Sequence, residues 1–440
     1  MKRQIRIVVL AALSLMIPEI SAAGYSFSFS CDRPAMAGFP DSINVFQAPL
    51  TNTGQDDSFS LAIAHRDHPG AWITTLCIDF VCFGDSFSWP LEAGATSIVK
   101  PDFTPYGVPG DGWITVRIKS FNNPADSQLL DFFFTAGQTT LVVCGDPNGN
   151  YAEYYGEALN ELGVPFNNWP RWFAPITVSD IQFYTKLIWF TGDAVQTLTT
   201  ADISIISGYL DAGRDLFISG QGIASDLRDS SFLNDYLHAA FYQTEDLRQI
   251  EGIAADTISY GLSFSISGQG GADNQNFPSS IIPKNYSTPT LVYGNGHIAG
   301  VKYSNGVSQR VFFPFGFEAI ADSSTRVTLA GRIADFFEVT TDINYDEPGL
   351  ELLPGSISLV GNYPNPFNSS TTIIADVGIG QEYTISVFDV GGRLVKNLHQ
   401  GWLAPGNYLF PWNALNNSSG VYYCRAVGIV NQSLPLLLLK

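Results

Sequence analysis

The chain has 440 residues, more than one ordinary hydrophobic core organises, so its length suggests about three domains of roughly 150 residues each. Hydrophobic residues make up 45% of it, which excludes a largely disordered chain. The 41 glycines and 25 prolines, with only 14% charged residues, favour β-rich modules of extracellular type. The formal net charge of -19 repels phosphate backbones and therefore excludes nucleic-acid binding.

The first 23 residues have the three-part form of a secretory signal peptide. A basic start over 2–6 precedes an uncharged, mostly apolar run over 7–17, and small residues over 21–23 precede the expected cleavage site. A membrane-spanning helix needs about 20 apolar residues, and this run is too short for one. We therefore expect an exported protein with no transmembrane anchor after signal cleavage.

The next segment, 24–137, alternates short apolar strands with turn residues and has no helical period. Runs such as 58–63 and 112–118 alternate with a period of two, a pattern typical of a β-sandwich. The stretch over 46–54 resembles the opening of the immunoglobulin-like (Ig-like) modules found in secreted bacterial proteins. We therefore expect an Ig-like β-sandwich over 24–137.

Export permits disulfide bonds, and the five cysteines are an odd number that leaves at least one thiol unpaired within the chain. Cys77 and Cys82 are close enough in sequence to clip a turn, and we predict a disulfide between them; Cys31 lies in the same N-terminal region. Cys144 and Cys424 lie in apolar, strand-like runs, where a buried thiol behaves as a small hydrophobic group.

Over 139–338 the pattern changes to strands that alternate with helices. The predicted strands are 141–144, 186–190, 216–219, 290–293, 299–303 and 310–315, and the predicted helices are 151–162, 199–212 and 326–337. Continuous apolar strands predict a parallel sheet covered on both faces, here a doubly wound, flavodoxin-like α/β fold. Such a sheet places a functional site in the loops after the carboxyl ends of its strands.

A polar segment over 339–356 is predicted to be a linker, and the chain is β-rich again over 357–440. This last segment opens with Asn-Tyr-Pro-Asn-Pro-Phe-Asn over 362–368 and continues through Gly391-Gly392 and Trp412. In these motifs it resembles the C-terminal sorting domain of the type IX (Por) secretion system, which has the Ig-like fold of a flagellar hook-cap module. The resemblance implies a secreted or cell-surface bacterial protein whose partner is the type IX machinery.

One departure from that family lies near the C-terminus. Members usually carry basic residues before the terminal apolar stretch, whereas Ser433-Leu434-Pro435 stands there in this chain. We expect Pro435 to weaken the end of the last strand, because proline lacks the N–H that a strand donates. The alternative interpretation of 357–440 is an Ig-like module that serves adhesion or rigidity.

Three stretches of the α/β segment, 188–193, 216–221 and 315–318, resemble the class I glutamine amidotransferase-like fold. In active members a cysteine on a glycine-flanked turn is activated by a histidine two residues before a glutamate. Here Ser219 takes the position of the cysteine, Gly316 takes that of the histidine, and only Glu318 is kept. The resemblance therefore implies a catalytically degenerate domain, and we expect no amidotransferase activity.

Two alternatives to a degenerate binding domain stay open at this stage. The first is a secreted hydrolase in which Ser219 is the nucleophile and His297, on a loop near the end of the sheet, is the base. The second is a purely structural or adhesive surface protein. The candidate catalytic residues are accordingly Ser219, His297 and Glu318.

Polar and aromatic residues gather near the predicted carboxyl edge of the sheet. The ligand-binding candidates are Asp146, Trp169, Trp172, Asp193 and Gln221. Aromatic rings beside carboxylates and amides suit a carbohydrate or a peptide, since sugar C–H faces stack on rings while hydroxyls need acceptors. The same aromatic residues could instead belong to the core.

No pattern in the sequence predicts a metal or another cofactor. His65 and His68 have no further ligands at metal-binding spacing. The run over 146–150 superficially resembles a calcium loop, with Asp146, Asn148 and Asn150 as conceivable ligands, but it lacks the glycine and closing glutamate of such loops. A turn that satisfies backbone groups after the first strand is the alternative.

Overall fold

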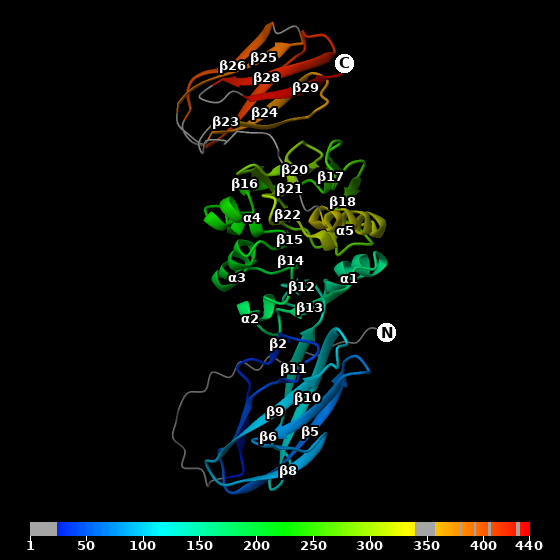
Figure 1. Cartoon of the computed structure of the whole chain (residues 1–440), viewed down its shortest axis with the longest axis vertical. Coiled ribbons are helices and arrows are strands. Elements are labelled where there is room, and N and C mark those ends of the chain that lie inside the picture. Colours follow the sequence, from blue (N-terminus) through cyan, green and yellow to red (C-terminus); the bar gives the residue numbers. More distant parts are fainter. Residues whose placement is uncertain (1–23, 339–356, 378–380, 391–392, 404–405, 428–431) are drawn as a thin grey trace.

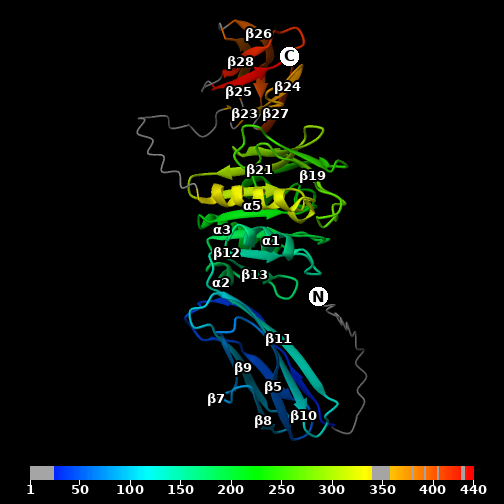
Figure 2. The same ribbon diagram turned by 90° about the vertical axis from the view of Figure 1, so that its right-hand side faces the viewer.

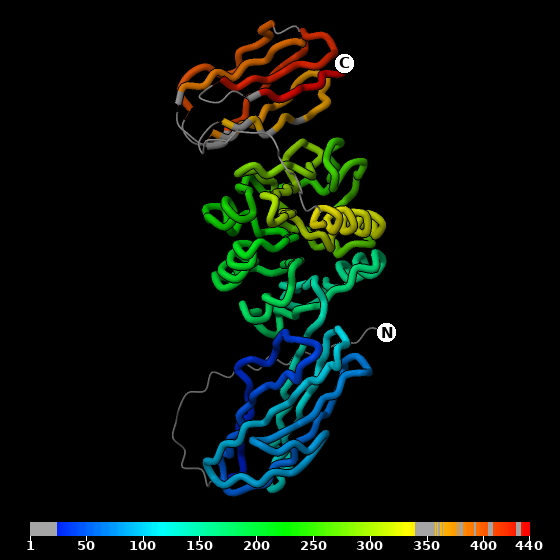
Figure 3. Tube along the Cα trace, in the orientation of Figure 1, coloured from blue at the N-terminus to red at the C-terminus, as the bar shows by residue number. Residues whose placement is uncertain are grey.

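The computed structural model describes residues 24–338, 357–377, 381–390, 393–403, 406–427 and 432–440. The predicted signal peptide (1–23) and the predicted linker (339–356) lie outside these residues. The described chain is β-rich and contains several separate sheets, and Figure 3 follows it from the N-terminal strands to the C-terminal ones.

Two β-sheets pack face to face at the N-terminal end of the chain, drawn in blue and cyan in Figure 1. The first contains β1 (Phe27–Phe29), β4 (Ala48–Asn52), β9 (Thr96–Thr104), β6 (Ile73–Ile78) and β7 (Val81–Cys82), with β3 (Asn44–Val45) paired to β9. The second contains β2 (Ala35–Gly38), β11 (Ser127–Ala136), β10 (Gly110–Ser120), β5 (Asp57–Asp67) and β8 (Ser86–Leu91). Alternate residues such as Phe59 and Leu61 are buried in the core that the sheets share, as a period-two pattern predicts.

Two of the five cysteines form a disulfide, and the other three are free, among them the half-buried Cys31. A disulfide joins Cys77 and Cys82 across the turn between β6 and β7. Cys144 and Cys424 are free and buried, and burial raises the pKa of each thiol to about 12. Neither thiol is therefore ionised at neutral pH, so both act as small apolar groups in the core.

The central part of the chain forms one mixed sheet of eleven strands. Its parallel half contains, in spatial order, β13 (Phe166–Pro170), β12 (Thr140–Cys144), β14 (Lys186–Phe190), β15 (Asp215–Ser219) and β22 (Gln309–Phe313). Antiparallel strands extend it: β21 (Ile298–Ser304), β20 (Thr288–Tyr293), β17 (Gln249–Gly252), β18 (Ser263–Ser265), β19 (Ser279–Pro283) and β16 (Ala239–Thr244). The sequence pattern had not predicted β13 or the segment from β16 to β19.

Helices cover both faces of this sheet (Figures 1 and 2). On one face α1 (Ala152–Glu161) and α5 (Ser323–Glu338) bury Tyr155 and Leu329 against the strands. On the other face lie α2 (Val178–Ile181), α3 (Thr200–Asp211) and α4 (Ile223–Asp226), where Ile206 and Ile223 are buried. Apolar residues on both sides of a parallel strand explain why β12, β14 and β15 have continuous apolar runs in the sequence.

The N-terminal sheets and the central sheet share a core. Phe133 of β11 packs edge-on against Trp169 of β13, with ring centroids 6.1 Å apart. Asp111 of β10 accepts hydrogen bonds from the Asn167 side chain at 2.8 Å and the Asn168 backbone N–H at 3.0 Å. Burial raises the pKa of Asp111, while these hydrogen bonds oppose the shift. The joint therefore combines aromatic packing with a partly buried polar network.

A pH-dependent contribution to stability is expected at the start of β15. Burial raises the pKa of Asp215 from 3.8 to about 6, although the hydrogen bond from the Gln309 backbone N–H and the charge of Lys186 act in the opposite direction. The folded protein thus holds this proton more tightly than the unfolded chain, so the contribution is complete below about pH 3.8 and is lost as pH rises through about 6. Asp215→Asn keeps an acceptor for Gln309, and its stability should fall less than that of the wild type over this range.

Urea unfolding at several pH values between about 4 and 7 measures this difference, with the exposed Asp229→Asn as the control. The control should follow the wild type. An Asp215→Asn protein with the pH profile of the wild type would contradict the assignment.

The C-terminal segment forms two further sheets with a common core. One contains β23 (Ile357–Tyr363), β24 (Ser370–Val377) and β27 (Gly406–Asn413), and the other contains β26 (Leu394–Leu403), β25 (Gln381–Asp389), β28 (Gly420–Val427) and β29 (Gln432–Leu438). Pro435 lies within β29 opposite Tyr423, and the strand continues beyond it to Leu438. Because β29 is at the edge of its sheet, the missing N–H of proline is tolerated there.

Candidate functional site

The residues compared with the amidotransferase nucleophile and glutamate lie in one buried chain of hydrogen bonds. Ser219 is the last residue of β15, and its hydroxyl lies 2.7 Å from the Tyr155 hydroxyl of α1. Tyr155 donates its single proton to Glu318 at 2.7 Å, so Ser219 is the donor to Tyr155. All three side chains are buried, and the Ser219 hydroxyl is engaged within the protein instead of facing a substrate.

Glu318 is held as a buried structural acceptor. Burial raises the pKa of its carboxyl group, while hydrogen bonds from Tyr155 and from the Asn274 side chain, the latter 3.1 Å long, oppose the shift. Its side chain is wholly buried in the 3₁₀ turn Phe317–Ala319. Glu318 therefore stabilises the hydrogen-bonded chain and is closed to solvent.

Gly316, the residue compared above with the amidotransferase histidine, has no space for a larger side chain. A Cβ atom added to Gly316 would lie 2.2 Å from Oε1 of Glu318 and 2.8 Å from Nε2 of Gln275. Gln275 is fixed there because its carbonyl accepts the Gly316 N–H at 2.9 Å and its amide donates to Asn274 at 2.7 Å. Glu318 and Gln275 thus occupy the volume that a base would need.

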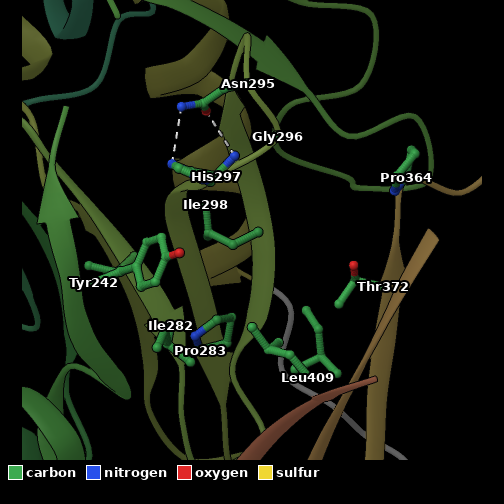
Figure 4. Close-up of a pocket in the computed structure, with 12 residues that line it drawn as sticks. Tyr242, Ile282, Pro283, Asn295, Gly296, His297, Ile298, Pro364, Thr372 and Leu409 are labelled. Carbon is green, nitrogen blue, oxygen red and sulfur yellow. Dashed lines mark hydrogen bonds between the residues drawn. The ribbon is translucent and has the colours of Figure 1, made fainter. Parts of the chain in front are cut away.

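His297 belongs to a different group of residues, between β20 and β21. Its Nδ1 lies 2.6 Å from the Glu245 carboxylate. The same Nδ1 is 3.1 Å from the Asn295 amide, a contact drawn in Figure 4. Among the described residues no hydrogen bond joins His297 to Ser219. Burial raises the pKa of Glu245, but hydrogen bonds from its neighbours, His297 among them, outweigh burial and leave the pKa below its ordinary value. The Ser219 and His297 side chains are thus engaged with different partners.

A cavity of about 550 Å³ lies beyond the carboxyl ends of β14 and β15. Its lining includes Asp193 from the loop after β14, Gln221 from the loop after β15, and the loop 272–277. The Gln221 carbonyl accepts the backbone N–H groups of Asn276 at 2.6 Å and Phe277 at 2.9 Å, and its amide donates to the Asn274 carbonyl at 2.7 Å. Gln221 therefore positions the loop that forms one wall of the cavity.

The lining is rich in hydrogen-bond acceptors. Three carboxylates face it, those of Asp193, Asp226 and Asp273, and no described lining residue is basic. Asn276 adds an exposed amide, and the Phe277 ring, 65% exposed, adds an apolar surface. Such a lining repels anions and suits a ligand that donates several hydrogen bonds and presents an apolar face.

The other predicted ligand residues lie away from the lining. Asp146 is buried and accepts the Asn150 backbone N–H at 2.8 Å, the arrangement of a turn. Trp169 is wholly buried in the joint with the N-terminal sheets, and its indole donates to the Ala174 carbonyl at 3.0 Å, so it offers no surface to a ligand. Trp172 is 43% exposed but stacks on Trp113 of β10 and does not line the cavity.

The loop 272–277 contributes five lining residues that the sequence had not suggested: Ala272, Asp273, Asn274, Asn276 and Phe277. Its run Ala-Asp-Asn-Gln-Asn-Phe is polar and ends in one aromatic residue, the only local signal that it carries. Among the described residues no three His, Cys, Asp or Glu side chains come close enough together to hold a metal ion.

Comparison with known proteins identifies the C-terminal segment. Residues 362–432 match the family model of the secretion system C-terminal sorting domain, Por_Secre_tail. The protein is therefore secreted or located at the outer cell surface by type IX export, and its sorting domain interacts with that machinery. No helix among the described residues has the length and apolar character required to cross a membrane. No curated protein matches the chain.

Several solved structures share a distant likeness. The N-terminal domain of mmIFT52 is 13% identical over 44% of this chain and 94% of its own length, with a TM-score of 0.33. A glutamine amidotransferase from Methylobacillus flagellatus is 7% identical over 45% and 94% of the two chains, with a TM-score of 0.32. One from Thermotoga maritima is 11% identical over 46% and 85%, with a TM-score of 0.30. At these scores the likenesses carry no argument about function.

Proposed function

We propose that residues 139–338 form a non-catalytic binding module of a type IX-exported surface protein. In this proposal the module has a degenerate, amidotransferase-like and doubly wound fold. It lies between an Ig-like sandwich over 24–137 and an Ig-like sorting domain over 357–440, with a signal peptide over 1–23 and a linker over 339–356. The observation that carries the proposal is that Glu318 and Gln275 fill the space of the catalytic histidine at Gly316.

The ligand that we propose is a carbohydrate bound in the 550 Å³ cavity. Sugar hydroxyls donate hydrogen bonds. Asp193, Asp226 and Asn276 line the cavity and have carboxylate or amide oxygens that can accept them. The apolar C–H face of a sugar ring can pack on the exposed Phe277 ring. An uncharged sugar is also compatible with the negative charge of the protein, which would repel an anionic ligand but not a neutral one.

Loss of the Phe277 ring should weaken carbohydrate binding. Phe277→Ala in the mature chain is expected to reduce affinity about tenfold or more, because removal of an aromatic contact costs roughly 1.4 kcal/mol. A glycan array identifies the ligand, and calorimetry with the best glycan measures the affinity. Phe121→Ala is the matched control, since Phe121 is 62% exposed but lies in the N-terminal part of the chain, just after β10.

Unchanged glycan affinity of Phe277→Ala would contradict the proposed site. Capture of peptides without any glycan would replace the carbohydrate with a peptide ligand, and absence of both would favour a structural or adhesive role. Glutamine or ester hydrolysis that disappears in Ser219→Ala would overturn the non-catalytic assignment.

A further inference from the structure

We infer that the type IX machinery contacts the outer face of the β26-β25-β28-β29 sheet, at an apolar patch formed by Leu394, Phe388, Tyr423, Val421 and Pro435. This inference rests on type IX export and adds the surface of the sorting domain that the secretion machinery binds. The patch follows from strand register. Leu394 lies opposite Phe388, Phe388 opposite Tyr423, and Tyr423 opposite Pro435, so one row of apolar side chains crosses all four strands.

The row lies on the side of the sheet that faces away from the core. In β28, Tyr422 and Cys424 are buried while Val421 and Tyr423 alternate with them and are exposed. Leu394 is 61% exposed, Val421 39% and Tyr423 37%. Contiguous exposed apolar side chains are uncommon on soluble proteins unless they bind a partner.

The patch has a sharp polar boundary. The next row across the same strands consists of Asn397, Ser386, Arg425 and Ser433 in register. The Arg425 guanidinium lies over the Phe388 ring, 5.2 Å from its centroid, at the boundary between the two rows. A cation beside an apolar patch fits a partner whose own apolar surface is edged by carboxylates.

Charge also distinguishes this segment from the rest of the chain. Residues 357–440 contain four basic and three acidic residues, whereas the whole chain has a formal charge of -19. An acidic partner surface would be repelled by most of the protein and not by the sorting domain. The charge distribution thus favours docking through this segment.

The other sheet of the C-terminal segment faces the central sheet. Leu409 of β27 and Pro364 line a cavity of about 300 Å³ together with Tyr242 and Ile282 of the central part (Figure 4). In Figure 1 the strands β25, β26 and β28 lie farther from the central strands than β23 does. The apolar patch is consequently on the outward sheet, and its residues Phe388, Leu394 and Tyr423 fall inside the family match over 362–432.

The test changes the patch in the full-length protein and follows delivery in a bacterium that has the type IX system. Leu394→Asp and Tyr423→Asp should each lower the surface or secreted fraction tenfold or more, because an unpaired charge in the interface weakens binding by more than a factor of ten. The undelivered protein should accumulate in the periplasm. Leu415→Asp is the matched control, since Leu415 is 59% exposed but lies in the turn between β27 and β28.

Deletion of 357–440 distinguishes failure of the patch assignment from failure of type IX export. If this deletion leaves delivery unchanged, type IX export itself is refuted. If the deletion blocks delivery while both patch variants reach the surface like the wild type, the patch assignment is overturned and the export route stands. Normal delivery with loss of a dimer in the variants would assign the patch to self-association. Melting curves of the purified variants equal to that of the wild type exclude misfolding as the cause of retention.

Discussion

Replacement of Gly316 by histidine is expected to destabilise the protein by about 3 kcal/mol or more and to create no hydrolase. Overpacking a core costs about 1–3 kcal/mol, and displaced buried hydrogen bonds add about 1–3 kcal/mol. Both apply here, because the new Cβ would lie 2.2 Å from the Glu318 carboxylate and the Gln275 amide beside it is also fixed by hydrogen bonds. The measurement is chemical unfolding together with a glutaminase assay of Gly316→His and of Ser219→Cys/Gly316→His.

Gly208→His provides the matched control for this experiment. Gly208 lies in α3, and no atom beyond its chain neighbours and the helix's own backbone is within 4 Å of its added Cβ, so histidine there should change stability little. A Gly316→His protein as stable as the wild type would show that Glu318 and Gln275 leave the position readily. Glutaminase activity in the double variant would show that these two substitutions are enough to restore catalysis, which would contradict our interpretation that Glu318 and Gln275 block the site.

Trp169→Ala should produce the second large effect, a loss of about 3–5 kcal/mol in the free energy of unfolding. The indole of Trp169 is wholly buried, packs edge-on against Phe133 and donates a hydrogen bond to Ala174. Its removal leaves a cavity in the joint between the N-terminal and central sheets. Urea unfolding measures the loss, and calorimetry with the glycan should show unchanged affinity under conditions where the variant is folded.

Trp172→Ala is the appropriate comparison, since Trp172 is 43% exposed and follows Trp169 by three residues. It should lose about 1 kcal/mol, the order expected for an aromatic stacking contact such as that with Trp113. A folded Trp169→Ala protein with wild-type stability and lost ligand affinity would restore Trp169 as a ligand-binding residue.

The sequence pattern predicted correctly those strands and helices that have a clear apolar run or helical period of their own. The apolar runs that predicted strands at 186–190 and 216–219 correspond to β14 and β15, and the predicted helix 199–212 corresponds to α3. The chain motif that opens at 362–368 predicted the sorting domain, which the family match confirms. In each case the residues themselves, at short separation, carry the information.

Long-range contacts explain what the sequence did not predict. Strand β13 contains two asparagines and a proline and therefore reads as a loop, but Asn167 and Asn168 are satisfied by Asp111, more than fifty residues earlier. The loop 272–277 is held by Gln221, likewise more than fifty residues away. No periodicity in a single segment reports such partners, so the burial of Trp169 and the wall of the cavity became visible only in the fold.

The shared core at the joint has a consequence for how such proteins can be rearranged. Residues 137–139 look like a place where a gene could be cut and one module exchanged for another. A cut there would separate Phe133 from Trp169. It would also remove the asparagine hydrogen-bond donors of the partly buried Asp111 carboxyl group. Recombination at that point should therefore yield fragments that expose apolar surface and aggregate. A recombinant protein that folds should have exchanged residues 24–338 as one unit.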